Sequence, residues 1–233
     1  EMSYTAKGEL LSRKESGVTT SYEYDVFGNV TKKLENDIIV ETNQYDALSR
    51  VIRTTDALGN FTTFVYDAEG NLLEETDKNG NKIKHEYDKK GQEIKTTDAL
   101  GNVFTYVYDA DGNQIESKDP AGNKTTTQYN AFSQPVKEAD SRGFLTEYVY
   151  NAKQQLITKK LPYNYQVNMT YDNAGNNISV KDTRGNISYT EYNSLGYLVK
   201  EKSANGSETT YAYDLEGQLT EKKYPNTLIE KYE

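Results

Sequence analysis

Apolar and polar residues alternate in short runs along the chain. Ile83 and Tyr87 fall on one side of an extended segment, whereas Lys84 and Glu86 fall on the other side. A period of two is typical of a β-strand that has one face toward water. Residues 103–108 repeat this pattern, so we predict short strands with a Tyr face and a mostly wet opposite face.

The Tyr residues that close these strands recur with an unbroken spacing of 21 residues. Each is followed by Asp or Asn, at Tyr24, Tyr45, Tyr66, Tyr87, Tyr108, Tyr129, Tyr150, Tyr171, Tyr192 and Tyr213. Seven positions later stands an aliphatic residue, at Ile52, Leu73, Ile94, Ile115, Val136, Ile157, Ile178 and Val199. We predict that these aliphatic side chains join the Tyr face. A fixed period without insertions predicts a repeat array in which every unit packs in the same way.

Two turn signals separate the strands of each unit. Their glycines are Gly28, Gly59, Gly70, Gly80, Gly91, Gly101, Gly112, Gly122, Gly143, Gly175, Gly185, Gly196, Gly206 and Gly217. The dipeptide Asn79-Gly80 is a strong hairpin signal, because both residue types tolerate the positive φ of a type I′ turn. Each repeat is therefore predicted to be one β-hairpin.

A few turns depart from this pattern. Ser49, Ser133 and Gln154 replace the expected Gly, and residues 161–164 lack both the Asp and the Gly-Asn pair. We expect the turn at residues 161–164 to differ from the others. Pro162 has no amide hydrogen to donate to a strand ladder, which favours a longer bend or an exposed loop there.

The composition indicates a folded but thin protein. Hydrophobic residues make up 35% of the 233 residues and the mean hydropathy is -0.88, yet 21 Tyr residues supply buriable surface. We predict an all-β fold: a single array of about ten repeats over residues 1–233, with residues 24–233 in strict register. A long antiparallel sheet of tandem hairpins twists, so it should curve or spiral into a strip or part of a hollow shell.

Charge and residue content exclude several classes of function. The formal net charge of -9 offers no basic patch for nucleic acid, and no apolar run is long enough to span a bilayer. The chain has no Cys, which excludes a disulfide framework and Cys-based metal sites. We expect no metal and no cofactor.

Candidate catalytic and metal-binding residues have simpler interpretations. His85 is the only His, and it occupies a repeat position filled elsewhere by Phe64 and Tyr106, so packing is favoured over a catalytic triad. Segment 109–113 is weakly similar to a calcium loop, but Pro120 stands where the bidentate Glu is required.

Paired carboxylates of a glycosidase are a further possibility at Glu74, Glu75 and Asp77. Charges on a solvated strand face are far commoner. We therefore predict no catalytic residues and no enzymatic activity.

The repeat unit resembles the YD repeats of rearrangement-hotspot (RHS) proteins. Residues 108–113 and 98–105 fit that pattern, Tyr-Asp-x-x-Gly-Asn followed by Asp-x-x-Gly-Asn, and the register holds ten times. Bacterial polymorphic toxins, wall-associated proteins, insecticidal toxin complexes and animal teneurins share such repeats. The resemblance implies a secreted or cell-surface shell that encloses a C-terminal effector domain of the same parent chain and helps to deliver it.

Family shells also contain a self-cleaving region near an Asp-Pro motif. Asp119-Pro120 lies in register with the ordinary turns at Asp77 and Asp98, so we interpret it as a turn. Because the chain begins and ends within the array, we expect it to be an internal fragment of a larger protein.

Two alternatives for partners stay open. The aromatic ladder is also compatible with a repeat solenoid that binds carbohydrates or cell-surface glycans, although such solenoids rely on Trp, which is absent. Unpaired strand edges could also recruit a second copy by edge-to-edge association.

Overall fold

The computed structural model describes residues 1–232, which form β-strands and one short 3-10 helix. The chain divides into two compact units. Unit 1 comprises Glu1–Val107 and Ser117–Gly122, and unit 2 comprises Tyr108–Glu116 and the chain from Asn123 onward. The expected all-β class is confirmed.

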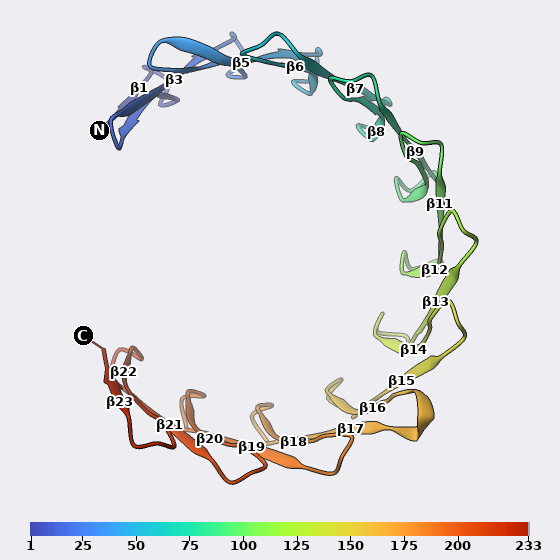
Figure 1. Cartoon of the computed structure of the whole chain (residues 1–233), viewed down its shortest axis with the longest axis vertical. Coiled ribbons are helices and arrows are strands. Elements are labelled where there is room, and N and C mark those ends of the chain that lie inside the picture. The colour runs from blue at the N-terminus through green and yellow to red at the C-terminus, as the bar shows by residue number, and fades with distance from the viewer. Residues whose placement is uncertain (233) are drawn as a thin grey trace. The chain divides into compact units, whose positions relative to one another are not determined.

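The first half of the chain contributes eleven strands, labelled in Figure 1. They are β1 (Met2–Tyr4), β2 (Leu10–Glu15), β3 (Val18–Tyr24), β4 (Val30–Glu35), β5 (Ile38–Tyr45), β6 (Val51–Asp56), β7 (Phe61–Tyr66), β8 (Leu72–Thr76), β9 (Lys82–Tyr87), β10 (Glu93–Thr97) and β11 (Val103–Tyr108). Each pairs antiparallel with the next from β1 to β11.

The second half repeats this organisation. It contains β12 (Gln114–Lys118), β13 (Lys124–Tyr129), β14 (Pro135–Ala139), β15 (Leu145–Tyr150), β16 (Leu156–Lys160), the 3-10 helix η1 (Pro162–Asn164), β17 (Gln166–Tyr171), β18 (Asn177–Lys181), β19 (Ile187–Tyr192), β20 (Leu198–Lys202), β21 (Glu208–Tyr213), β22 (Leu219–Lys223) and β23 (Ile229–Lys231). Consecutive strands from β13 to β23 again pair antiparallel.

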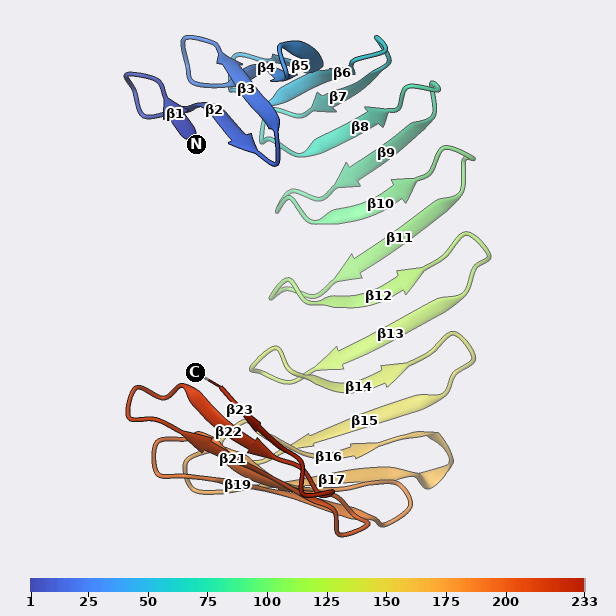
Figure 2. The ribbon, with the colours of Figure 1, turned by 60° about the vertical axis from the view of Figure 1, so that its left-hand side comes forward.

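Within each unit, consecutive strands lie side by side in a single row (Figure 2). The row of strands in each unit follows a curved line (Figure 1). Right-handed strand twist accumulates over many strands and prevents a flat sheet. The predicted curving strip of hairpins is therefore confirmed for each unit.

Most turns share one geometry, which differs from the predicted type I′ turn. The Gly80 amide donates to the Asp77 carbonyl oxygen at 3.0 Å, and the Asp77 amide donates to the Asn81 carbonyl oxygen at 2.9 Å. Gly80 has φ of +83°, whereas Asn79 is not among the residues with positive φ. This is a type I turn followed by a left-handed residue, a three-residue hairpin loop. The type I′ prediction at Asn79-Gly80 was wrong, because Asp three residues before Gly favours type I.

Two-residue type I′ loops occur elsewhere, near the N-terminus. Both central residues have positive φ at Ser16-Gly17, between β2 and β3, and at Asn36-Asp37, between β4 and β5. Sequence reasoning missed both of them. Asn36-Asp37 carries two residue types that tolerate the left-handed region, which is the signal that could have identified it.

The three turns that lack the expected Gly keep the same backbone. Ser49, Ser133 and Gln154 have φ of 61°, 57° and 65°. Their amides still donate to the carbonyl oxygen three residues earlier, for example from Gln154 to Asn151 at 3.0 Å. The repeat therefore imposes a left-handed conformation on residue types that disfavour it.

The turn at Leu161–Tyr165 differs from the others, as predicted. It forms the 3-10 helix η1, with Tyr163 and Asn164 at φ of 63° and 61°. Of the two expected forms, the structure has the exposed loop, since Tyr163 and Tyr165 are 76% and 55% exposed. It does not have a longer bend, since the Leu161 amide donates to the Tyr165 carbonyl oxygen at 2.7 Å, as the Asp140 amide does to Phe144 at 3.0 Å. Two consecutive left-handed residues change the turn without lengthening it.

A β-bulge recurs beside the repeat Tyr. In the β7–β8 pair, Val65 opposes Glu74 but Tyr66 opposes Leu72, so the register shifts by one residue. Leu73 is the extra residue, and it falls on the face of Tyr66, as predicted for the aliphatic series. Bulges increase local twist and bend the strand, so this recurrent shift contributes to the curvature of the strip.

No side chain in residues 1–232 is fully buried. The repeat Tyr residues are half-buried, whereas Val65, Val107 and Val149 on the opposite face are 50%, 44% and 38% exposed. The wet face was predicted correctly. The fold is one sheet layer thick, with no hydrophobic core among the described residues.

Candidate functional site

The repeat Tyr residues form a ladder of hydrogen bonds to the backbone. The Tyr87 hydroxyl, at the end of β9, donates to the Leu72 carbonyl oxygen at the start of β8, at 3.0 Å. The same bond joins Tyr24 to Leu10, Tyr45 to Val30, Tyr129 to Gln114, Tyr150 to Pro135, Tyr171 to Leu156 and Tyr213 to Leu198, at 2.7 to 3.1 Å. We call these bonds the tyrosine ladder. Each one fastens a strand to the strand before it.

A Tyr hydroxyl must stay protonated to donate the ladder hydrogen bond. Burial is the main cause that raises the pKa of Tyr45, Tyr87 and Tyr150 above the ordinary value of 10.0. A phenol with a raised pKa stays protonated at neutral pH, so it keeps its O–H donor. Tyr45, Tyr87 and Tyr150 therefore keep their ladder bonds throughout the physiological range.

Two repeats replace the ladder bond by another contact. The Arg50 guanidinium lies 4.8 Å from the centre of the Tyr66 ring. In the repeat of Tyr192, the Thr190 hydroxyl donates to the Asn177 carbonyl oxygen instead. The contact between neighbouring strands is thus preserved although its chemistry changes.

A recurrent Asp–Asn pair closes many of the turns. The Asp77 carboxylate accepts the Asn79 and Asn81 amides at 2.8 and 2.9 Å, and the Asn81 side-chain amide at 2.8 Å. Equivalent pairs are Asp25–Asn29, Asp56–Asn60, Asp67–Asn71, Asp98–Asn102, Asp109–Asn113, Asp172–Asn176 and Asp182–Asn186. Hydrogen bonds from the Asn side chain and amide hold the pKa of Asp77 below its ordinary value. We call this arrangement the turn lock.

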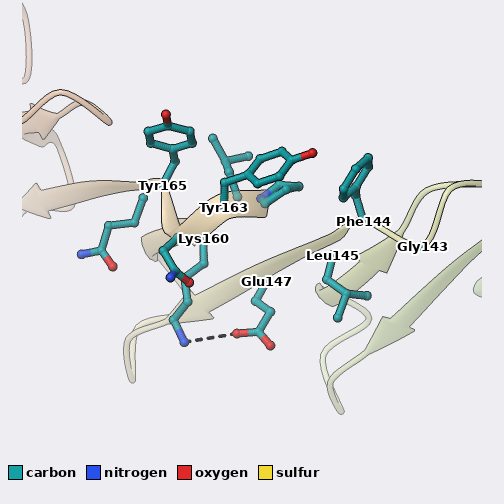
Figure 3. Close-up of a pocket in the computed structure, with 11 residues that line it drawn as sticks. Gly143, Phe144, Leu145, Glu147, Lys160, Tyr163 and Tyr165 are labelled. Atoms are coloured by element: carbon teal, nitrogen blue, oxygen red, sulfur yellow. Dashed lines mark hydrogen bonds and ion pairs between the residues drawn. The ribbon is translucent and has the colours of Figure 1, made fainter.

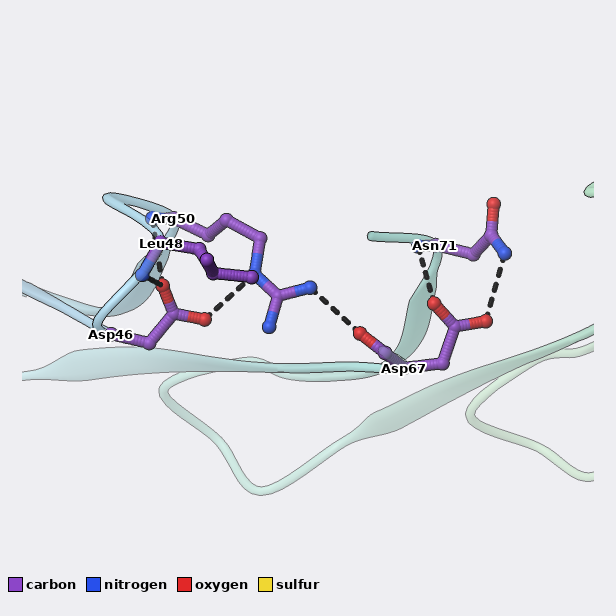
Figure 4. A network of polar contacts seen from close by, with 5 residues as sticks. All are labelled: Asp46, Leu48, Arg50, Asp67 and Asn71. Atoms are coloured by element: carbon purple, nitrogen blue, oxygen red, sulfur yellow. Dashed lines mark hydrogen bonds and ion pairs between the residues drawn. The ribbon is translucent and has the colours of Figure 1, made fainter. Parts of the chain in front are cut away.

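Side chains of neighbouring repeats also join turn to turn. Arg50 takes the Asn position of the turn lock, where its Nε donates to Asp46 Oδ2 at 2.7 Å (Figure 4). Its Nη1 reaches the next repeat and donates to the Asp67 carbonyl oxygen at 2.7 Å. Gln155 makes a similar link, from Nε2 to the Gly175 carbonyl oxygen at 3.2 Å.

This linking position was missed by the sequence analysis. The predicted site residues were the Tyr and Gly series, and their assignment as the structural site remains a proposal. In the links made by Arg50 and Gln155, the linking residue follows the turn Gly position. The signal for this position was the recurrent Gly-Asn pair, as at Gly70-Asn71. Only the structure shows that larger residues, such as Arg50, reach the neighbouring turn.

The candidate catalytic groups are occupied by structural contacts. His85 is half-buried, and its Nδ1 lies 2.5 Å from Glu93 Oε1, in agreement with the packing interpretation. Glu74 pairs with Lys82 at 2.5 Å. Glu75 opposes Ile83 on the other face of β8, so the two adjacent carboxylates do not converge.

The suspected calcium loop and cleavage motif are turns. Asp109 accepts the Asp111 and Asn113 amides at 3.0 and 2.9 Å, which uses the carboxylate for the turn lock. The Gly122 amide donates to the Asp119 carbonyl oxygen at 2.9 Å, which is the ordinary turn geometry predicted for Asp119-Pro120. Within residues 1–232, no group of three acidic or His side chains converges to hold a metal ion.

Among the described residues, no helix has the length and apolar character needed to cross a membrane. Tyr hydroxyls join neighbouring strands, linking side chains join neighbouring turns, and turn carboxylates close single turns.

Comparison with solved structures identifies the fold. The chain is similar to a TcdB2–TccC3–Cdc42 complex, with a TM-score of 0.75 and 18% identity over 99% of this chain and 15% of that chain. It is also similar to the Tc holotoxin pore of Photorhabdus luminescens, with a TM-score of 0.73, 18% identity and the same coverages. The chain thus spans about 15% of the length of these neighbours. At this identity the likeness shows the fold alone.

Comparison at the level of sequence identifies the family. No curated protein matches the chain. The model of the RHS repeat matches residues 45–82, 87–124, 108–147 and 192–229, which together cover more than half of the chain. The tyrosine ladder and the turn lock explain physically why this repeat conserves its length from one unit to the next. The chain belongs to the RHS repeat family.

Proposed function

We propose that this chain is a non-catalytic structural segment of an RHS-type toxin protein that is secreted or displayed at the cell surface. Its strip would form part of the wall of a shell that encloses a C-terminal effector domain of the parent chain and helps to deliver it. RHS repeat membership and the fold shared with toxin-complex proteins support this proposal.

The observation that carries the proposal is the repeat-to-repeat bonding in a sheet without a core. Bonds of the tyrosine ladder and turn-to-turn links recur along the chain and join neighbouring strands and turns, so the length of the strip does not depend on a central core. Such a strip is one layer thick and presents two extended faces. That is the geometry that a thin wall requires.

The burial of the repeat Tyr rings argues against the alternative in which a ladder of these rings binds sugars. A stacking platform needs exposed ring faces, whereas these rings are half-buried and seven of them use their hydroxyls for backbone hydrogen bonds. Packing between strands accounts for their position.

Limited proteolysis of the parent protein tests the enclosure. Three samples are needed: the parent chain, its C-terminal domain alone, and that domain mixed with the separate repeat array. We expect the domain to resist protease only within the parent chain, because a wall must surround its cargo. Equal digestion in the parent chain and in the isolated domain would contradict the proposal, and protection in the mixture would indicate simple binding instead.

A further inference from the structure

The turn between β20 and β21 departs from the turn lock in a way that changes the environment of an Asn side chain. Ser203 stands at the position that Asp77 fills in the regular turn. In that regular turn, the amide four residues on donates to the Asp77 carboxylate. Here the equivalent amide, that of Ser207, donates to Asn205 Oδ1 at 3.0 Å.

The side-chain carbonyl oxygen of Asn205 accepts a second hydrogen bond. The Ser203 hydroxyl donates to Oδ1 at 2.5 Å. Two donors on one carbonyl oxygen make the attached carbon, Cγ, more electrophilic, and they stabilise the negative charge that forms on the oxygen when a nucleophile attacks. The bond from Ser207 also folds the side chain over the next peptide bond, as in an Asx turn, which brings Cγ toward the Gly206 nitrogen.

The Gly206 nitrogen is open to this reaction. Asn205 and Gly206 are both exposed, and a Cβ built on Gly206 would meet no atom within 4 Å. The amide hydrogen of Gly206 points to the Ser203 carbonyl oxygen at 2.9 Å, in the plane of the peptide bond. Attack on Cγ uses a face of that plane, and no side chain on Gly206 shields it.

The turn at Asn79 contains the same dipeptide without this activation. Asn79 also precedes an exposed Gly, and the Gly80 amide makes the same hydrogen bond, to the Asp77 carbonyl oxygen at 3.0 Å. The Asn81 amide, however, donates to the Asp77 carboxylate at 2.9 Å, so this donor does not polarise the Asn79 side chain. A neighbouring carboxylate also disfavours new negative charge on the Asn79 oxygen.

Two other turns contain a suitable Asn but no Gly after it. Asn226 Oδ1 accepts the Leu228 amide at 3.2 Å, but Thr227 is the next residue. Asn164 is exposed, but it precedes Tyr165, whose side chain projects from the turn in Figure 3. A side chain on the following residue hinders access to its main-chain nitrogen. The turn at Asn205 combines the polarised carbonyl with the open nitrogen.

We propose that Asn205 is a site of spontaneous deamidation in the folded protein, where it reacts faster than Asn79. The Gly206 nitrogen forms a bond to Asn205 Cγ, the Cγ–Nδ2 bond breaks, and ammonia leaves with the amide proton. Water then opens the succinimide ring at either carbonyl carbon, which gives Asp or isoaspartate. The isoaspartate product lengthens the main chain within the turn.

The reaction adds a carboxylate to a charged surface. Asn205, Glu208 and Lys223 line the same hollow of about 550 Å³. Glu208 already pairs with Lys202 at 3.0 Å. Deamidation therefore gives this hollow a second carboxylate beside Lys223, and it makes the β20–β21 turn a place where the charge of the folded chain changes with time.

Incubation of the folded chain at mildly alkaline pH, followed by peptide mass spectrometry and isoaspartate-specific methylation, measures both sites in one sample. We expect Asn205 to react roughly fivefold or more faster than Asn79, the rate equivalent of one to two hydrogen bonds. The rate should rise with pH, because base generates the attacking nitrogen anion. In concentrated urea both turns are lost, so the two rates should become nearly equal.

Exchange of one residue between the two turns tests the cause. Ser203→Asp restores the turn-lock carboxylate, which should take back the Ser207 amide and slow Asn205 to about the rate of Asn79. Conversely, Asp77→Ser should accelerate the reaction at Asn79. Circular dichroism of both variants shows that the sheet is retained.

Gly206→Ser tests access to the attacking nitrogen. Ser133 holds the same turn position with φ of 57°, so this change is compatible with the turn, and we expect it to slow deamidation at Asn205. The matched control is Gly185→Ser, in a turn without Asn before the Gly, which should leave the rate at Asn205 unchanged.

Equal rates at Asn205 and Asn79 in the folded chain would overturn the proposal. An unchanged rate at Asn205 in Ser203→Asp would do the same, since the hydrogen bonds to Oδ1 would then be irrelevant. Formation of Asp without isoaspartate would show direct hydrolysis in place of attack by Gly206. None of these results bears on protease protection by the parent shell, so this site and the proposed function are tested separately.

Discussion

Single residues hold the strip together through hydrogen bonds as much as through burial. The Tyr87 ring is only half-buried because a single sheet layer has no second layer to cover it. Its hydroxyl, however, reaches the Leu72 carbonyl oxygen on the neighbouring strand. The repeated residue is Tyr rather than Phe at all ten positions of the period, and seven of these hydroxyls make the ladder bond.

Removing one hydroxyl tests this role. We expect Tyr87→Phe to lower the free energy of unfolding by about 0.5–1.5 kcal/mol, the net value of one hydrogen bond, as measured by urea unfolding. Tyr66→Phe is the matched control, since the Tyr66 ring packs under Arg50 and its hydroxyl makes no hydrogen bond among the described residues. Equal losses in both variants would show that the ladder bond contributes nothing specific.

The sequence predicted the repeat residues well and their substitutes poorly. A fixed period located the ten repeat Tyr residues and the turn glycines from Gly28 onward, but not Gly8 and Gly17. It could not predict that Gln154 would keep the left-handed backbone of a Gly, since local propensity opposes this conformation. The environment of the array prevails over propensity at that residue.

The sequence predicted the positions of these turns correctly but their turn type incorrectly. The Asn79-Gly80 dipeptide alone suggested type I′, whereas the wider spacing, with Asp77 three residues before Gly80, specifies type I followed by a left-handed residue. The strand bulge at Leu72–Leu73 was also missed, because no residue type marks it. Both features depend on pairing across strands rather than on one short segment.

The turn lock makes the array sensitive to acid. In ten turns the pKa of the Asp carboxyl lies below its ordinary value of 3.8, as at Asp77, where hydrogen bonds from Asn81 stabilise the charged form. Their stabilisation is complete about one pH unit above the unfolded-state pKa of 3.8 and is lost as the pH falls through the lowered values. We expect Tm, measured by circular dichroism, to stay level down to about pH 5 and then to fall.

A neutral turn supplies the control for this prediction. Asn130 already replaces Asp in one repeat, and it accepts the Phe132 amide at 2.9 Å without a charge. The double variant Asp67→Asn and Asp77→Asn should therefore keep its turns and lose less Tm between pH 5 and pH 3 than the wild type. An acid transition of the same size in both proteins would exclude the turn carboxylates as its cause.

The whole chain shows how far composition constrains architecture. Low hydrophobic content and regular Tyr predicted a folded protein without a thick core, and the structure confirms it, since no described side chain is fully buried. The contact between the Phe144 and Tyr163 rings could not be predicted, because it joins two turns that come together only in the folded sheet. Cargo identity is not encoded in the repeat pattern, which specifies contacts between repeats.

The central claim is that this chain is part of a wall around a cargo. Cryo-electron microscopy of the longest parent chain that can be purified tests it most directly. We expect residues 1–233 to form a continuous stretch of a closed shell, with separate density for the C-terminal domain inside. A straight, open rod with the C-terminal domain exposed to solvent would contradict the claim.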